Sequence, residues 1–111
     1  MLHSSSKVAI YMEGHLFTDY GKMGHGVLRY LPNPIVAVID SENVGKNIKD
    51  CLSIDNNVPV VKDIDAAIFN GAEVLILGIA SSGGKIPKSW LPVIDTAILK
   101  GLSIINGLHD E

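Results

Sequence analysis

Residues 35–41 read Ile-Val-Ala-Val-Ile-Asp-Ser, and this stretch decides the fold class. Its five consecutive apolar residues are mostly β-branched, and the run is too short for a helix of ordinary length. A strand with apolar side chains on both faces is typical of a parallel sheet that helices cover on both sides. The polar pair Asp40 and Ser41 then marks the end of the strand and the start of a loop.

Four further apolar runs have the same character, and each predicts another buried strand. The third strand along the chain contains Pro59, which suits a strand start or the edge of a sheet. The last run is closed by Gly107. The four runs are residues 8–12, 58–61, 74–79 and 102–106.

Between the strands, apolar residues recur at helical spacing and predict three helices. Ser41 or Asn43 is expected to cap the first helix. The second is expected to begin at Asp63 as N-cap and to stop at Gly71, and the third to stop at Gly101. The apolar stripes are Val44, Ile48, Cys51 and Leu52; Ile64, Ala67 and Ile68; and Trp90, Ile94, Ala97 and Ile98.

Strands that alternate with helices predict an α/β architecture. We expect a three-layer Rossmann-like domain with a mostly parallel sheet of about five strands, and a length of 111 residues suits one such domain at residues 1–111. The first connection, between Glu13 and Pro34, is the exception, because it lacks a clean helical stripe and carries four glycines.

Composition and charge exclude several classes of partner. The net charge is −3 and no run of Lys or Arg occurs, so nucleic-acid binding is not predicted. The apolar runs fall short of the roughly 20 residues of a membrane span, and no signal peptide precedes them. The single cysteine, Cys51, forms no intrachain disulfide and is interpreted as a small buried apolar residue. We expect a cytoplasmic protein.

The standard nucleotide-binding loops are absent from the sequence. The pattern G-x-G-x-x-G begins at residues 24–29, but it ends in arginine and lies too far beyond the first strand. A P-loop fails because six residues separate Gly14 from Gly21 and Lys22, and Met23 stands where Ser or Thr would bind Mg²⁺. Neither NAD nor a P-loop nucleotide is predicted to bind this chain.

A cationic, glycine-rich stretch occupies the first connection. If it is helical, the cationic side chains share one face at positions i, i+3 and i+7, which suits a phosphate or a carboxylate. A solvated surface turn that needs glycine for its backbone shape explains the same residues equally well. The residues are Gly21, Lys22, Gly24, His25, Gly26, Arg29 and Tyr30.

Two loops that follow strands are further candidates, since ligands of parallel sheets bind beyond the carboxyl ends of the strands. Asp40, with Ser41, stands where an acid would accept a hydrogen bond from a ribose hydroxyl. The preference for an acidic residue at the start of a helix explains the presence of Asp40 better. The loop after the fourth strand combines small residues with a cation, which favours an anion slightly over a flexible connector without a ligand. Its candidate residues are Ser81, Ser82, Gly83, Gly84 and Lys85.

The four histidines form no i, i+4 pair and have no cysteine nearby, so no metal site is predicted. A lone histidine is more often structural than catalytic. His25 and His109 are nevertheless the candidates for a group that transfers a proton near neutral pH.

Several blocks of the sequence together resemble the N-terminal Rossmann-like domain of the D-glutamate N-acetyltransferase-like family, formerly a domain of unknown function. They are residues 24–30, 38–46, 78–90 and 107–109. The resemblance implies acetyl transfer from acetyl-CoA to an amine, with His25 or His109 as the base. It also implies a C-terminal P-loop NTPase-like domain, absent from these 111 residues.

Three hypotheses follow. The chain is expected to be a ligand-binding domain of such an acetyltransferase, which holds a small anionic ligand, is inactive alone and forms a homo-oligomer at full length. The second hypothesis is a module that binds CoA or a nucleotide without catalysis. The third is a structural domain that mediates oligomer formation.

Overall fold

The computed structural model describes residues 3–79 and 86–106. Five strands form one parallel sheet in the order β3-β2-β1-β4-β5. This confirms the predicted fold class, with every pairing parallel. The strands are β1 (Val8–Tyr11), β2 (Ile35–Ile39), β3 (Val60–Val61), β4 (Val74–Leu77) and β5 (Ser103–Asn106).

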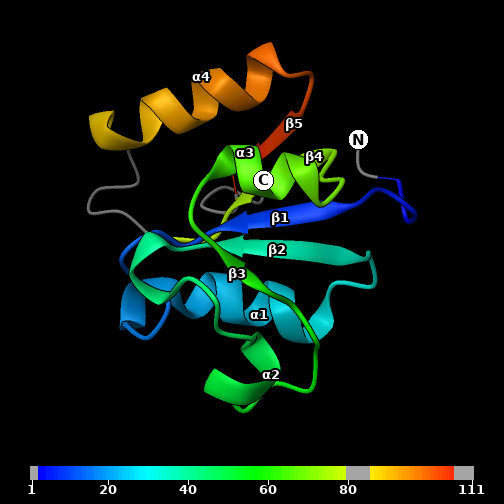
Figure 1. Ribbon diagram of the computed structural model, residues 1–111, viewed down its shortest axis with the longest axis vertical. Coiled ribbons are helices and arrows are strands. Elements are labelled where there is room, and N and C mark those ends of the chain that lie inside the picture. Colours follow the sequence, from blue (N-terminus) through cyan, green and yellow to red (C-terminus); the bar gives the residue numbers. More distant parts are fainter. Residues whose placement is uncertain (1–2, 80–85, 107–111) are drawn as a thin grey trace.

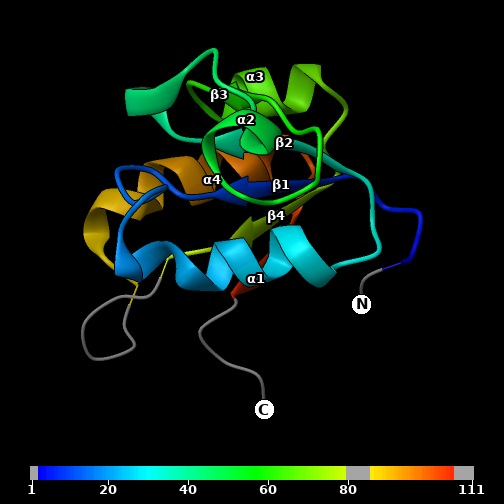
Figure 2. The same ribbon diagram turned by 90° about the horizontal axis from the view of Figure 1, so that it is seen from below.

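Helices cover both faces of the sheet (Figure 1). The α-helices are α1 (Lys22–Tyr30), α2 (Ile48–Cys51), α3 (Ile64–Phe69) and α4 (Leu91–Leu99), and the 3-10 helices are η1 (Asp19–Gly21), η2 (Ser41–Asn43) and η4 (Lys88–Trp90). In Figure 1, α1 and α2 lie below the sheet and α3 and α4 lie above it. Figure 2, seen from below, shows α1 running lengthwise alongside the sheet.

The core forms on both faces of the central strand. Val8, Ala9, Ile10 and Met12 are fully buried, as a strand in the middle of a covered parallel sheet requires. The side chains of Ile10 and Met12 point toward α1, where they crowd the glycines of that layer. Tyr11 alternates to the opposite face, as the period of a strand demands, and its ring meets Trp90.

The predicted signals of the second and third helices are confirmed. Asp63 caps α3, because its carboxylate Oδ1 accepts a hydrogen bond from the Ala66 N–H at 2.9 Å. Gly71 follows α3 with φ +99° and Gly101 follows α4 with φ +89°. Both values lie in the left-handed region, where glycine escapes the steric penalty of a Cβ, so both helices stop where expected.

Two helix predictions are corrected. The first predicted helix, from Val44 to Leu52, is reduced to the single turn of α2, which is capped by the side chain of Asn47 instead of Ser41 or Asn43. The reason is Gly45, whose φ of +90° breaks the helix and leaves Val44 exposed. In α4, Ile94 and Ala97 face the core, but Ile98 turns away and is 56% exposed.

The first connection contains a helix after all. Residues 19–21 make one 3-10 turn and α1 follows without a break, with Gly24 and Leu28 as its buried residues. Among the helices of the described residues, none has the length and apolar character needed to cross a bilayer.

Candidate functional site

The chain crosses over in opposite directions on the two sides of the pair β1 and β4. From β1 the connections lead outward through β2 to β3, while from β4 they lead to β5. Where connections diverge in this way, the loops at the carboxyl ends of the strands separate and leave a crevice that parallel sheets use for ligands. The candidate site is therefore the carboxyl edge of β1 and β4, with α1 on one face and α4 on the other.

The start of α1 is fixed against the end of β4 at this edge. The N–H of Gly24 donates to the carbonyl of Gly78 at 3.0 Å. A Cβ on Gly78 would lie 2.6 Å from Ile10 Cγ2 and 3.1 Å from the Cα of Gly24, so only two glycines permit this approach. The N–H groups of Gly21 and Lys22 also donate, to Thr18 and Asp19 carbonyls. These three donors are committed within the protein and are therefore not free for an anion at the start of α1.

The cationic side chains lie on the same helix, α1, but they are far apart along its axis. The helix runs opposite to the strands, so Lys22 lies near the carboxyl edge while Arg29 and Tyr30 lie toward the amino edge (Figure 1). Seven residues of helix amount to about 10 Å of axial distance between Lys22 and Arg29. Lys22 also forms an exposed ion pair with Asp19 at 3.7 Å. A small anion would therefore contact one end of this face, not both.

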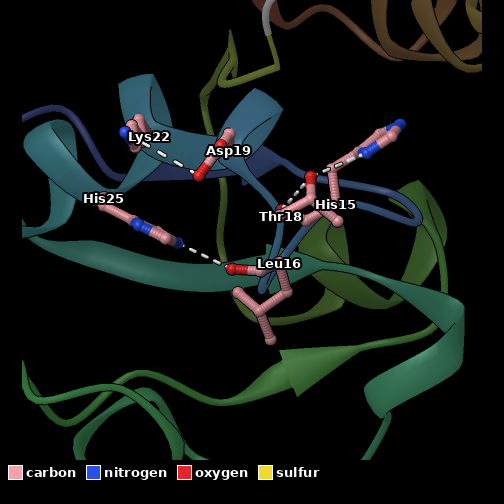
Figure 3. A network of polar contacts seen from close by, with 6 residues as sticks. All are labelled: His15, Leu16, Thr18, Asp19, Lys22 and His25. Atoms are coloured by element: carbon pink, nitrogen blue, oxygen red, sulfur yellow. Dashed lines mark hydrogen bonds and ion pairs between the residues drawn. The ribbon is translucent and has the colours of Figure 1, made fainter.

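His25 connects α1 to the loop that precedes it (Figure 3). Its Nε2 lies 2.6 Å from the carbonyl oxygen of Leu16, and because a carbonyl only accepts, Nε2 carries the proton. In neutral His25 the remaining basic nitrogen is then Nδ1. In the same loop, His15 Nδ1 lies 2.9 Å from Thr18 Oγ1. His25 therefore has a positioning contact, and any role as a base would use Nδ1.

Asp40 is fully buried and binds three groups of the protein. Its Oδ1 accepts the N–H of Gly14 at 3.2 Å and the N–H of Glu42 at 3.1 Å, while Oδ2 accepts Asn43 Nδ2 at 2.7 Å. These bonds join the loop after β1 to the loop after β2. The geometry favours the structural role of an acid at a helix start, and ribose binding by Asp40 stays a prediction.

Ser41 is held by Glu13 across the same two loops. The Ser41 N–H donates to Glu13 Oε1 at 2.7 Å, and the Ser41 hydroxyl donates to Glu13 Oε2. Lys46 lies nearby, where its ammonium donates to Asn43 Oδ1 at 2.9 Å and sits 5.5 Å from the centre of the Phe17 ring. The carboxyl ends of β1 and β2 thus carry Glu13, Asp40 and Glu42 with Lys46 as the adjacent cation.

The remaining predicted site residues lie outside the described residues. They are Ser81, Ser82, Gly83, Gly84, Lys85 and His109. Gly26, by contrast, lies on α1 with open space where a Cβ would stand. Within residues 3–79 and 86–106, no group of three or more His, Cys, Asp or Glu side chains is arranged to hold a metal ion.

Comparison with known proteins agrees with this architecture. Residues 41–111 match the model of a domain of unknown function, the DUF1611_N Rossmann-like domain. A crystal structure of a DUF1611 family protein from Anabaena variabilis is similar, with a TM-score of 0.87 and 39% sequence identity over 96% of this chain. The chain belongs to the DUF1611_N family.

Two curated relatives of this DUF1611_N domain are D-glutamate N-acetyltransferases. The chain is 51% identical over 41 residues to the protein from a Pseudoalteromonas species and 40% identical over 47 residues to that from Tritonibacter scottomollicae. These matches cover 37% and 42% of this chain but 12% and 14% of the relatives. The match to the Anabaena protein likewise covers 31% of that chain.

The sequence did not predict one aromatic contact beside the candidate site, between Tyr11 and Trp90. Tyr11, the last residue of β1, packs edge-on against Trp90, which precedes α4, with ring centres 5.8 Å apart and planes at 69°. Both residues are buried in the core, which confirms the prediction of Trp90 on a core-facing stripe and of Tyr11 in a buried strand. The available signal was the position of Tyr11, since a polar-tipped residue at the carboxyl end of a central strand reaches the ligand edge.

Proposed function

We propose that this chain is the ligand-binding domain of an amine N-acetyltransferase-like enzyme and holds an acyl acceptor or acetyl-CoA at the carboxyl edge of β1 and β4. The observation that carries the proposal is the similarity to two D-glutamate N-acetyltransferases within a DUF1611_N domain. The divergence of connections at β1 and β4 supports this location.

The reaction sets clear demands on the site. The nitrogen of the amine attacks the thioester carbonyl carbon of acetyl-CoA, the C–S bond breaks, and CoA leaves as the thiol. The amine enters as an ammonium, so a base must take one proton before or during attack. Nδ1 of His25 is our first candidate for the base in that step, and His109 is the second candidate. Acetyl-CoA supplies the acetyl group when bound.

We further propose that catalysis requires protein beyond this domain, because the matched segments cover only 12% and 14% of the acetyltransferase relatives. The partner would be a P-loop NTPase-like C-terminal domain, in one chain or as a separate subunit, within a cytoplasmic homo-oligomer. Lys22 and the loop of residues 81–85 would then hold the phosphates of CoA or the carboxylate of the substrate.

The test combines binding with turnover. Calorimetry of this chain with acetyl-CoA, D-glutamate, ATP and NAD should show binding of acetyl-CoA or D-glutamate. Acetylation of D-glutamate should be absent for this chain alone and present for a full-length D-glutamate N-acetyltransferase measured in parallel. Turnover by this chain alone would contradict the need for a second part. Binding of ATP or NAD only would support a nucleotide-binding module, and no binding at all would overturn the proposal.

The role of His25 is tested separately by His25→Gln, transplanted with this domain into a full-length relative. Glutamine keeps a donor for the Leu16 carbonyl but removes the base. We expect acetyl transfer to fall at least tenfold while the fold is retained. An unchanged rate would remove His25 from the mechanism and leave His109.

A further inference from the structure

The helix α4 is apolar on the side that faces away from the sheet as well as on the side that faces it. Of its nine residues, Asp95 alone is charged. Ile94 and Ala97 are buried against the core. The outer side carries Ile98 and Leu99, which are 56% and 86% exposed. A helix that is apolar all round is normally covered by protein on all sides.

The helix on the other face of the sheet has an ordinary solvated surface. α1 exposes Lys22 and Arg29 and buries Gly24 and Leu28, so its polar and apolar sides are distinct. α4 lacks this division. The difference indicates that water covers the outer side of α1, whereas the outer side of α4 is suited to a second protein surface.

The exposed residues of α4 share one side of the helix. Leu91, Asp95 and Ile98 occupy positions i, i+4 and i+7, and Leu99 follows at i+8. Phe69, which is 90% exposed, ends α3, the helix that packs beside α4 (Figure 1). We call these five residues the α4 patch. Its apolar side chains expose roughly 500 Å², and an apolar patch of about 300–600 Å² on a monomer is often functional.

Two exposed charges of opposite sign make the α4 patch complementary to itself. Asp95 and Lys100 are five residues apart, which is about 7 Å along the helix axis. In a two-fold pair, residue i of one copy meets residue j of the other, and j meets i. When Asp95 lies opposite Lys100 of the second copy, the same ion pair forms twice. The two-fold axis then passes beside Ile98, so apolar side chains meet at the centre with charges around them, as in ordinary interfaces.

We propose that a second copy of this chain packs on the α4 patch, with the two α4 helices antiparallel and Asp95 opposite Lys100 of the other copy. The apolar area places this dimer among weak complexes, which bury less than about 600 Å² per partner. The axis lies near the carboxyl end of α4, toward the amino edge of the sheet, so the candidate site stays open (Figure 1). This inference specifies the homo-oligomer of the proposed function but does not depend on acetyl transfer.

Sedimentation velocity of this chain between about 1 μM and about 1 mM measures the association. We expect a monomer–dimer equilibrium with a dissociation constant in the micromolar range. Leu99→Ser should weaken the dimer about tenfold or more, because it removes apolar area near the axis. The fold should be retained by circular dichroism, since Leu99 is mostly exposed within one copy.

Charge reversals test the antiparallel arrangement. Asp95→Lys brings like charges together at both ion pairs, and so does Lys100→Asp, so each single variant should weaken association about tenfold or more. The double variant Asp95→Lys/Lys100→Asp restores opposite charges and should associate within about threefold of wild type. Asp50→Lys is the matched control, because it makes the same charge change at an exposed position on α2, across the sheet from α4, and should leave association unchanged.

Several results would overturn this inference. One is a chain that stays monomeric at about 1 mM, which would leave the α4 patch to a different protein surface. Another is association that Leu99→Ser does not weaken, and a third is a double charge variant that associates no better than either single variant. The proposed function is tested separately, because binding of acetyl-CoA or D-glutamate at the carboxyl edge does not involve the α4 patch.

Discussion

Asp40 organises the carboxyl edge at the scale of a single residue. A buried carboxylate is costly unless it is hydrogen-bonded, and Asp40 meets that condition with two backbone N–H groups and one amide. The bonds tie Gly14 after β1 to η2 after β2. The residue therefore fixes the relative position of two loops that border the candidate site.

Replacement of Asp40 by alanine should destabilise the fold strongly. It would leave three donors without their acceptor at a fully buried position. We expect the free energy of unfolding to fall by about 2–4 kcal/mol in urea denaturation. Asp95→Ala, at an exposed position on α4, is the control and should change it by less than about 0.5 kcal/mol. Equal effects of the two variants would contradict the structural role of Asp40.

Cys51 is a second residue with a measurable property. Burial raises the pKa of its thiol above the ordinary value, despite the opposing effects of a backbone hydrogen bond and Lys46. Because the thiolate is the reactive form, less of it is present at pH 8 than in an exposed thiol. Reaction with a disulfide reagent should be several-fold slower than that of glutathione and should accelerate as the pH rises. A faster reaction than that of glutathione would point to an activated cysteine.

At the scale of elements, the contact between α1 and β4 depends on glycine. Gly24 and Gly78 face each other, and neither position leaves room for a side chain. This contact also explains why α1 could not be predicted with certainty. A helix is normally predicted from a stripe of apolar residues in the sequence. In α1, however, the residue that contacts the sheet is a glycine, and glycine adds nothing to such a stripe.

Two glycine substitutions should act in opposite directions. Gly78→Ala would place a methyl group 2.6 Å from the branched side chain of Ile10, and we expect a loss of about 1–3 kcal/mol in unfolding free energy. Gly26→Ala meets open space within α1 and should stabilise the protein by about 0.5–1 kcal/mol, since alanine is the better helix former. Thermal unfolding, monitored by circular dichroism, distinguishes the two variants. A destabilising Gly26→Ala would show that this face of α1 is covered.

The strands and the later helices could be predicted because their signals are local. Runs such as residues 35–39 and 74–77 are apolar throughout, and Asp63 and Gly71 mark the limits of α3. The site could be predicted only in part. The contact of Tyr11 with Trp90 depends on how η4 packs against β1, which no local pattern contains. Lys22 and Arg29 lie on one helix, but seven residues of helical rise separate them by about 10 Å, and the direction of α1 leaves only Lys22 near the carboxyl edge.

At the scale of the whole molecule, apolar side chains remain exposed on the layer of α3 and α4. Phe69 is 90% exposed, Leu99 is 86% exposed and Ile98 is 56% exposed. All three lie at the carboxyl ends of their helices, toward the amino edge of the sheet and thus away from the candidate site (Figure 1). Their side chains contribute little to the core.

Phe69→Ser should therefore leave stability nearly unchanged while it raises solubility. We expect the free energy of unfolding to change by less than about 0.5 kcal/mol, because the aromatic ring buries little area within the chain. Light scattering at high protein concentration should show less association than in wild type. A large loss of stability would mean that Phe69 packs within the fold.

The central place of β1 has a consequence for how the chain folds. β1 is synthesised before the other strands of this sheet, yet one of its two partners, β4, is made last but one among them, and Val8 pairs with Val74. Contacts between such distant segments slow folding. Until Leu77 has been synthesised, β1 is an open edge of apolar residues that invites pairing with other chains. Nascent chains of this domain that are arrested before that point should therefore be the ones that aggregate or engage chaperones.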